Sequence, residues 1–139
     1  MMRPDRALER GVRNRAGGRC EYCHRPESVA EVRFVIDHVI AQKHRGRSTV
    51  ENLALACEFC NLHKGSDIAG LDPVDGTLTR LFHPRKDLWQ QHFRLDDSGV
   101  LAGLTPVGRT TLEVLAMNDP RQLALRLMLI AEGVMSVPG

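Results

Sequence analysis

The four cysteines of this chain stand in two Cys-x-x-Cys pairs, Cys20/Cys23 and Cys57/Cys60. One such pair supplies two sulfur ligands from a single tight turn, so two pairs supply the four thiolates of a tetrahedral structural zinc site. The 33 residues between the pairs are more than a simple zinc ribbon holds, so an element must fold between them. Closing so long a loop with a metal ion offsets a large chain entropy. We therefore predict one structural Zn²⁺ bound by Cys20, Cys23, Cys57 and Cys60.

Two other interpretations of the pairs are a thioredoxin-like redox motif and a set of buried, unligated thiols. A redox protein carries one such motif beside a βαβ unit, and the sequence has no pattern for that unit. The first ten residues contain no apolar signal segment, and the longest apolar stretch, 123–131, is too short to span a membrane. We therefore expect a cytoplasmic protein with no membrane association. In a reducing compartment, paired cysteines are more often metal ligands than disulfides.

The positive charge of the chain is concentrated in its first half. Residues 1–66 carry 12 Lys and Arg against 8 Asp and Glu, whereas residues 67–139 carry 7 against 9. The half with the cysteines is thus the basic half, as a phosphate-bearing partner such as DNA would favour. A solvated surface is equally compatible with this skew. The side chains that we expect near phosphates are Arg10, Arg13, Lys43, Arg45, Arg47, His63 and Lys64.

The hydrophobic pattern between the pairs predicts two strands followed by a helix. Val32, Phe34 and Ile36 alternate with other residues, which is the period of a half-buried strand. That strand delivers Asp37 and His38 at its end. The other predicted elements of this half are a basic helix over 4–16, a second strand over 53–56 and a short helix over 61–68.

The second half reads as a supporting extension. Turn residues and alternation predict a turn over 72–76 and a hairpin of 92–95 with 100–104. Pro106 and Pro120 each begin a helix, and the second helix places Leu123, Leu127 and Ile130 on one face. Because 139 residues are too few for two independent cores, we expect a single α+β domain over 1–139, with a core over 17–70 and an extension over 71–139.

A polar constellation accompanies the cysteine pairs and suits phosphodiester hydrolysis. His38 is a natural general base, since its ordinary pKa near 6.5 permits proton uptake at neutral pH. Asp37 is a hard oxygen ligand suited to Mg²⁺ or another divalent ion, and the side-chain carbonyl of Asn61 can complete the protein's metal ligands. Asn52 can hydrogen-bond across the hairpin loop and hold His38 in orientation.

Three stretches carry a family resemblance: DHVIAQKHRG, ENLALAC and CEFCNLHKGS. Together they resemble the HNH endonucleases, the ββα-metal or His-Me finger group, in the form with a four-cysteine zinc. The resemblance implies that His38 is the general base, Asp37 a metal ligand and Asn52 the residue that orients the base. The third position of the motif, directly after the last Cys, is Asn61, so the chain is an H-N-N variant and a hard ion such as Mg²⁺ is favoured.

The function expected from the resemblance is metal-dependent hydrolysis of DNA phosphodiester bonds. A second interpretation is a zinc-stabilised DNA-binding module without catalysis, as part of a larger assembly. A third is a zinc-dependent interaction domain for protein partners. The module shares the cysteines and the basic half, but it does not require His38 beside Asp37. The adjacent pair therefore favours the enzyme. The DNA sequence preferred and the oligomeric state stay open.

Overall fold

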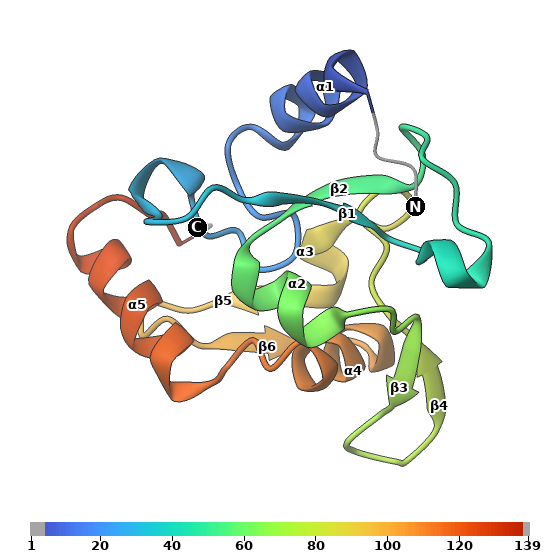
Figure 1. Ribbon diagram of the computed structural model, residues 1–139. Helices are drawn as coiled ribbons and strands as arrows, with labels where there is room; N and C mark the ends of the chain where they lie inside the picture. The colour runs from blue at the N-terminus through green and yellow to red at the C-terminus, as the bar shows by residue number, and fades with distance from the viewer. Residues whose placement is uncertain (1–4, 138–139) are drawn as a thin grey trace. The chain divides into compact units, whose positions relative to one another are not determined.

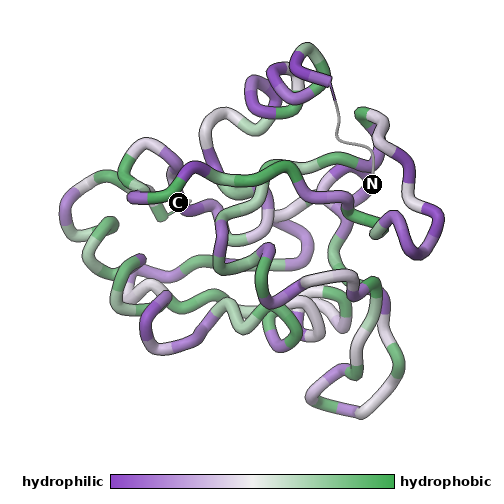
Figure 2. Tube along the Cα trace, in the orientation of Figure 1, coloured by the Kyte–Doolittle hydropathy of each residue, from purple (hydrophilic) through white to green (hydrophobic). Residues whose placement is uncertain are grey.

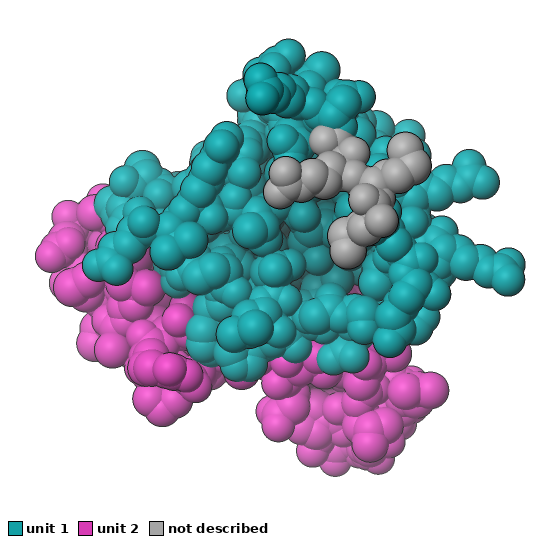
Figure 3. Space-filling model, viewed as in Figure 1, with its two compact units in different colours: residues 1–68, 83–86 teal, residues 69–82, 87–139 magenta. Residues whose placement is uncertain are grey.

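The computed structural model describes residues 5–137 and divides the chain into two compact units (Figure 3). Unit 1 comprises residues 1–68 and 83–86, and unit 2 comprises residues 69–82 and 87–139. Both contain helices and small antiparallel strand pairs, which confirms the α+β class. The division after residue 68 lies close to the core boundary expected after residue 70. A single domain over 1–139 stays a prediction.

Unit 1 begins with helix α1, Arg6–Ala16 (Figure 1). The side chain of Asp5 accepts a hydrogen bond from the Leu8 amide and caps the first turn. Gly17 ends the helix in the left-handed conformation, at φ 65°, where a residue without Cβ is favoured. Val12 is the buried residue of this helix. Figure 2 colours much of α1 hydrophilic, because arginines occupy its other faces.

The centre of unit 1 is an antiparallel hairpin of β1, Val35–His38, and β2, Leu53–Ala56. All four residues of β2 are buried. The predicted start of the first strand was wrong: Val32 is 55% exposed and lies outside the strand. Asp37 and His38 are the last two residues of β1 and pair with β2, in agreement with their expected place at the end of the strand. The hairpin itself gives these two side chains their fixed places.

The helix of the ββα arrangement, α2, spans Glu58–Lys64. It begins three residues earlier than the sequence predicted and ends before Ile68. The reason is local: the sulfur of Cys57 accepts a hydrogen bond from the Cys60 amide and acts as the N-cap. The second cysteine knuckle is thus also the first turn of α2. Two short 3-10 turns, η1 (Glu27–Val29) and η2 (Gln42–His44), complete unit 1.

The described residues of unit 2 form two short hairpins and three helices. The hairpin of 93–95 with 101–103 and two longer helices match the predicted elements, whereas the hairpin around the turn at 72–76 and a short helix at 89–92 were not predicted. The elements are β3 (Ala69–Leu71), β4 (Leu78–Arg80), α3 (Trp89–His92), β5 (Phe93–Leu95), β6 (Leu101–Gly103), α4 (Pro106–Val114) and α5 (Pro120–Ala131).

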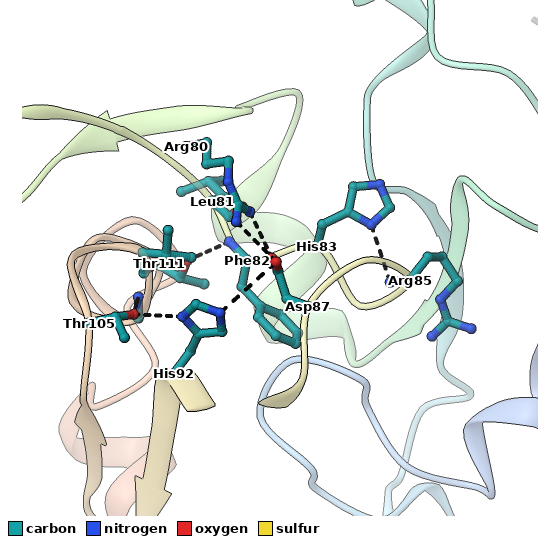
Figure 4. A network of polar contacts seen from close by, with 11 residues as sticks. Arg80, Leu81, Phe82, His83, Arg85, Asp87, His92, Thr105 and Thr111 are labelled. Atoms are coloured by element: carbon teal, nitrogen blue, oxygen red, sulfur yellow. Dashed lines mark hydrogen bonds and ion pairs between the residues drawn. The ribbon is translucent and has the colours of Figure 1, made fainter. Parts of the chain in front are cut away.

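Polar side chains tie α3 to the start of α4 in unit 2 (Figure 4). Asp87 accepts from both terminal nitrogens of Arg80, at 2.7 and 3.0 Å, and lies 4.0 Å from Nε2 of His92. Nδ1 of His92 is 2.6 Å from Oγ1 of Thr105, which also accepts from the Gly108 amide and caps α4. His92 thus belongs to a helix-capping network.

Among the described residues, none of the helices has both the length and the apolar character needed to cross a membrane.

Candidate functional site

The four cysteines form one buried cluster in unit 1. Their sulfur atoms all lie within 4.8 Å of one another, and those of Cys23 and Cys57 are 3.8 Å apart. Four sulfurs at about 2.3 Å from a central zinc would be separated by roughly 3.8 Å, so the cluster has the dimensions of a zinc tetrathiolate. The amides of Cys23 and Cys60 donate to the sulfurs of Cys20 and Cys57, at 3.5 and 3.3 Å. The donor set therefore fits Zn²⁺.

A buried cation accompanies this cluster. Arg25 is 4% exposed, donates to Oε1 of Glu58 at 2.5 Å, and lies over the Phe34 ring. Burial first, and neighbouring thiols next, raise the pKa of Cys20 well above its usual value. Four thiolates in such a place need compensating positive charge. Zn²⁺ would supply most of that charge, and the guanidinium of Arg25 adds to it.

His38 is held at one ring nitrogen by a residue that sequence reasoning missed. Its Nε2 is 2.8 Å from Oγ of Ser48, which comes from the loop between β1 and β2. When Nε2–H donates to Ser48, the lone pair of the imidazole lies on Nδ1, as a general base requires. Burial lowers the pKa of His38 below its ordinary value, and so does Lys64, while Asp37 acts in the opposite direction. This shift favours the neutral form of the ring.

Asp37 is buried beside His38 and already has two partners. The hydroxyl of Tyr22 donates to its Oδ2 at 2.8 Å, and Nζ of Lys64 lies 3.2 Å from Oδ2 and 3.4 Å from Oδ1. Burial raises the pKa of Asp37, although the Lys64 ammonium and the Tyr22 hydroxyl act in the opposite direction. The carboxylate is a hard donor, but a divalent ion could bind it only in competition with Lys64. The fit to a catalytic metal is thus incomplete.

Asn52 holds the loop between the strands closed. Its Oδ1 accepts from the Ile40 amide at 2.9 Å, and its Nδ2 donates to the carbonyls of Ile40 and Arg47 at 3.0 and 2.9 Å. Gly46 lies so close that an added Cβ would fall 1.6 Å from the Ile40 carbonyl oxygen. The partners of Asn52 are backbone groups of this loop, which also carries Ser48.

The residues of α2 lie against the end of β1. Asn61 is half-buried and stands three residues before Lys64, so the two share a helix face. That face meets β1, because Nζ of Lys64 also donates to the main-chain carbonyl of His38 at 3.1 Å. His63 lies outside this face. Its Nδ1 is 2.9 Å from the Phe59 carbonyl oxygen, and the ring centroids of the two residues are 4.1 Å apart, with the rings tilted.

The side chains expected near phosphates differ in their exposure. Arg10, Lys43, Arg45 and Arg47 are exposed, the last three in the loop after His38. Arg13 is half-buried and bonded to Glu27. Lys64 is 1% exposed and faces Asp37 rather than solvent, which differs from its expected place. Its Nζ is paired inside unit 1, and a phosphate contact by Lys64 stays a prediction.

Residues 20–67 match the family model described as HNH endonuclease. The match covers both cysteine pairs, β1, β2 and α2, and it confirms the resemblance seen in the three sequence stretches. This part of the chain is therefore similar to an HNH endonuclease domain, and it contains a cysteine cluster able to hold a metal ion. No curated protein matches the chain, and neither does any solved structure.

Proposed function

We propose that the chain is a metal-dependent endonuclease that hydrolyses DNA phosphodiester bonds at the end of β1. The observation that supports this most is the pairing of His38 with Ser48 within the region that matches the HNH family. A zinc cluster or a DNA-binding surface alone has no need of a neutral, partly exposed imidazole aligned by a hydroxyl. Such an imidazole is what activation of water requires.

His38 takes the proton of the attacking water at Nδ1 in this proposal. Ser48 fixes the ring through Nε2, and Asn52 keeps the loop that carries Ser48 in place. The exposed cations of the loop, Lys43, Arg45 and Arg47, bind phosphates beside the scissile bond. A divalent ion, with Mg²⁺ as the first choice for oxygen ligands, would act as a Lewis acid on the phosphate, and Asp37 and Asn61 are the ligands that we assign to it.

The competing proposal is a DNA-binding module without catalysis. The buried Lys64–Asp37 ion pair favours it, because a carboxylate that is satisfied internally stabilises the fold without any bound metal. The proposals differ in one measurable property. Only the endonuclease converts supercoiled plasmid into nicked or linear DNA.

The test is incubation of the purified full-length protein with supercoiled plasmid in Mg²⁺, in Mn²⁺ and in chelator. We expect cleavage in at least one divalent ion and none in chelator. Zinc content measured after each incubation separates removal of a catalytic ion from loss of the structural zinc. Binding of the plasmid without any cleavage in either ion would exclude the endonuclease and leave the binding module.

A further inference from the structure

A second basic surface lies in unit 1 along α1, formed by residues other than those at the end of β1. It is a cleft of about 320 Å³ whose lining comprises Arg6, Glu9, Arg10, Arg13 and Arg33. Every one of these side chains is charged, and four of the five are cations. Most of the lining surface is polar and the cations outnumber the single carboxylate, so the cleft suits an anion.

The cleft is held in shape by one of its own arginines. Arg13 donates to Oε2 of Glu27 at 3.0 Å and to the carbonyl of Phe34 at 2.7 Å. The same Glu27 oxygen accepts from the Phe34 amide at 2.8 Å. This node fixes the segment that carries Arg33 against α1. Because the walls are already in place, a ligand would not have to order them on binding.

Three of the cations are exposed and so accessible to a partner outside the protein. Arg6 and Arg10 lie one turn apart on α1, about 6 Å along its axis, and Arg33 comes from the chain ahead of β1. Within residues 5–137, no hydrogen bond or ion pair is seen for these three guanidinium groups. Glu9 opposes them with a single negative charge, so the cleft keeps a positive balance.

We infer that this cleft binds consecutive phosphates of the nucleic-acid backbone at a distance from the scissile bond. The inference rests on the proposed function for the identity of the substrate. Guanidinium groups match phosphate oxygens in paired hydrogen bonds, and a row of them suits a polyanion better than a single ion. The cleft fixes the register of the duplex while the loop after His38 binds the phosphates that are cut.

Binding of a labelled DNA duplex by the full-length protein tests this, measured by fluorescence anisotropy over a range of salt without added divalent ion. The double variant Arg10→Gln/Arg33→Gln should bind several-fold more weakly, and its dependence of log Kd on log salt should flatten by roughly 0.9 for each charge removed. Glu9→Gln should shift affinity in the opposite direction. Arg94→Gln, an exposed arginine of β5 in unit 2, is the matched control and should bind like wild type.

Hydrolysis of a small chromogenic phosphodiester separates this inference from the proposed function. Such an ester is too small to span both the end of β1 and the cleft, so its hydrolysis by the wild-type protein reports on the end of β1 alone. The double variant should show a raised KM for plasmid. If the double variant kept the wild-type affinity and the wild-type salt dependence, the phosphate-binding role of the cleft would be wrong, even if the protein still cleaved plasmid. If binding depended on the cleft but the wild-type protein cleaved no DNA, the role of the cleft would stand and the proposed endonuclease activity would be wrong. A wild-type protein that binds no nucleic acid would overturn both.

Discussion

Nζ of Lys64 lies 3.2 Å from Oδ2 of Asp37, and the two side chains are 1% and 5% exposed. A divalent ion bound to the same carboxylate would stand within a few ångströms of the ammonium, where repulsion between cations is strong at low dielectric. The lysine therefore does two things: it stabilises a buried carboxylate in the absence of metal, and it opposes an ion that approaches Asp37.

Lys64→Met should make the protein depend on a divalent ion for stability. Breaking a buried ion pair by removing one partner costs about 3–5 kcal/mol, because the other charge is left uncompensated. Mn²⁺ can then take the freed carboxylate, so thermal melting should rise with Mn²⁺ in the variant far more than in wild type. Bound Mn²⁺ can be counted by electron paramagnetic resonance. Lys86→Met, at an exposed lysine, is the control. Equal Mn²⁺ binding by variant and wild type would show that Lys64 does not compete.

Zinc removal should unfold unit 1. We expect about one zinc per chain, and Cys57→Ser should lower that content and the melting temperature sharply. The substitution is informative because a serine hydroxyl can still cap α2 in place of the Cys57 sulfur. Loss of stability in Cys57→Ser thus reports the missing ligand. Cys23→Ser, which touches no helix cap, should lose zinc to the same extent. Well-folded protein that contains no zinc would contradict the predicted zinc site.

The loop after β1 should tolerate no side chain at residue 46. A Cβ at Gly46 would meet the Ile40 carbonyl at 1.6 Å and Nδ2 of Asn52 at 2.8 Å. Gly46→Ala should therefore open the loop, at a cost of about 1–3 kcal/mol, and reduce plasmid cleavage while zinc content is kept. Gly11→Ala is the matched control, since nothing lies within 4 Å of its added Cβ on α1. It should raise stability by about 0.5–1 kcal/mol. If Gly46→Ala cleaved plasmid at the wild-type rate, the closed form of the loop would not be needed for catalysis.

The features that sequence predicts best here are those set by local spacing. Four cysteines in two pairs, and a strand ending in Asp37-His38, are local patterns. The buried position of Lys64 is not a local pattern, because it depends on contact with the carboxylate of Asp37, which lies 27 residues earlier in the chain. Ser48 was missed for the same reason: its partner His38 meets it only once the loop has closed.

Helix α5 illustrates the same limit in unit 2. Apolar periodicity predicted an inward face with Leu127, but Leu127 is 47% exposed and Arg126 is 1% exposed. The arginine is buried because the Gly99 carbonyl and Oδ1 of Asn118 accept its hydrogen bonds at 2.7 and 2.9 Å. Acceptors of this kind leave no trace in hydrophobic spacing, since they come from the turn between β5 and β6 and from the segment just before α5.

The distinction between enzyme and binding module depends on His38. His38→Ala removes the proposed base and leaves the cysteine cluster, the cleft along α1 and the exposed loop cations unchanged. The variant should keep its zinc and bind duplex DNA with wild-type affinity, while plasmid cleavage falls by on the order of 10²-fold or more. Asn61→Ala should also lose cleavage, through weaker metal binding, so a higher Mg²⁺ concentration should partly restore it. Added metal should not restore His38→Ala, because the missing group is a proton acceptor.

His44→Ala controls for the loss of an imidazole from the same region, since His44 is exposed in the loop that follows β1. It should cleave like wild type. The cleavage rate of Ser48→Ala should lie between those of His38→Ala and His44→Ala, because the base is present but its ring is no longer held at Nε2. Equal cleavage by wild type and His38→Ala would exclude the proposed mechanism and place the base elsewhere. If His38→Ala and His44→Ala lost cleavage activity equally, the cause would be disruption of the loop, because only His38 is assigned as the proton acceptor.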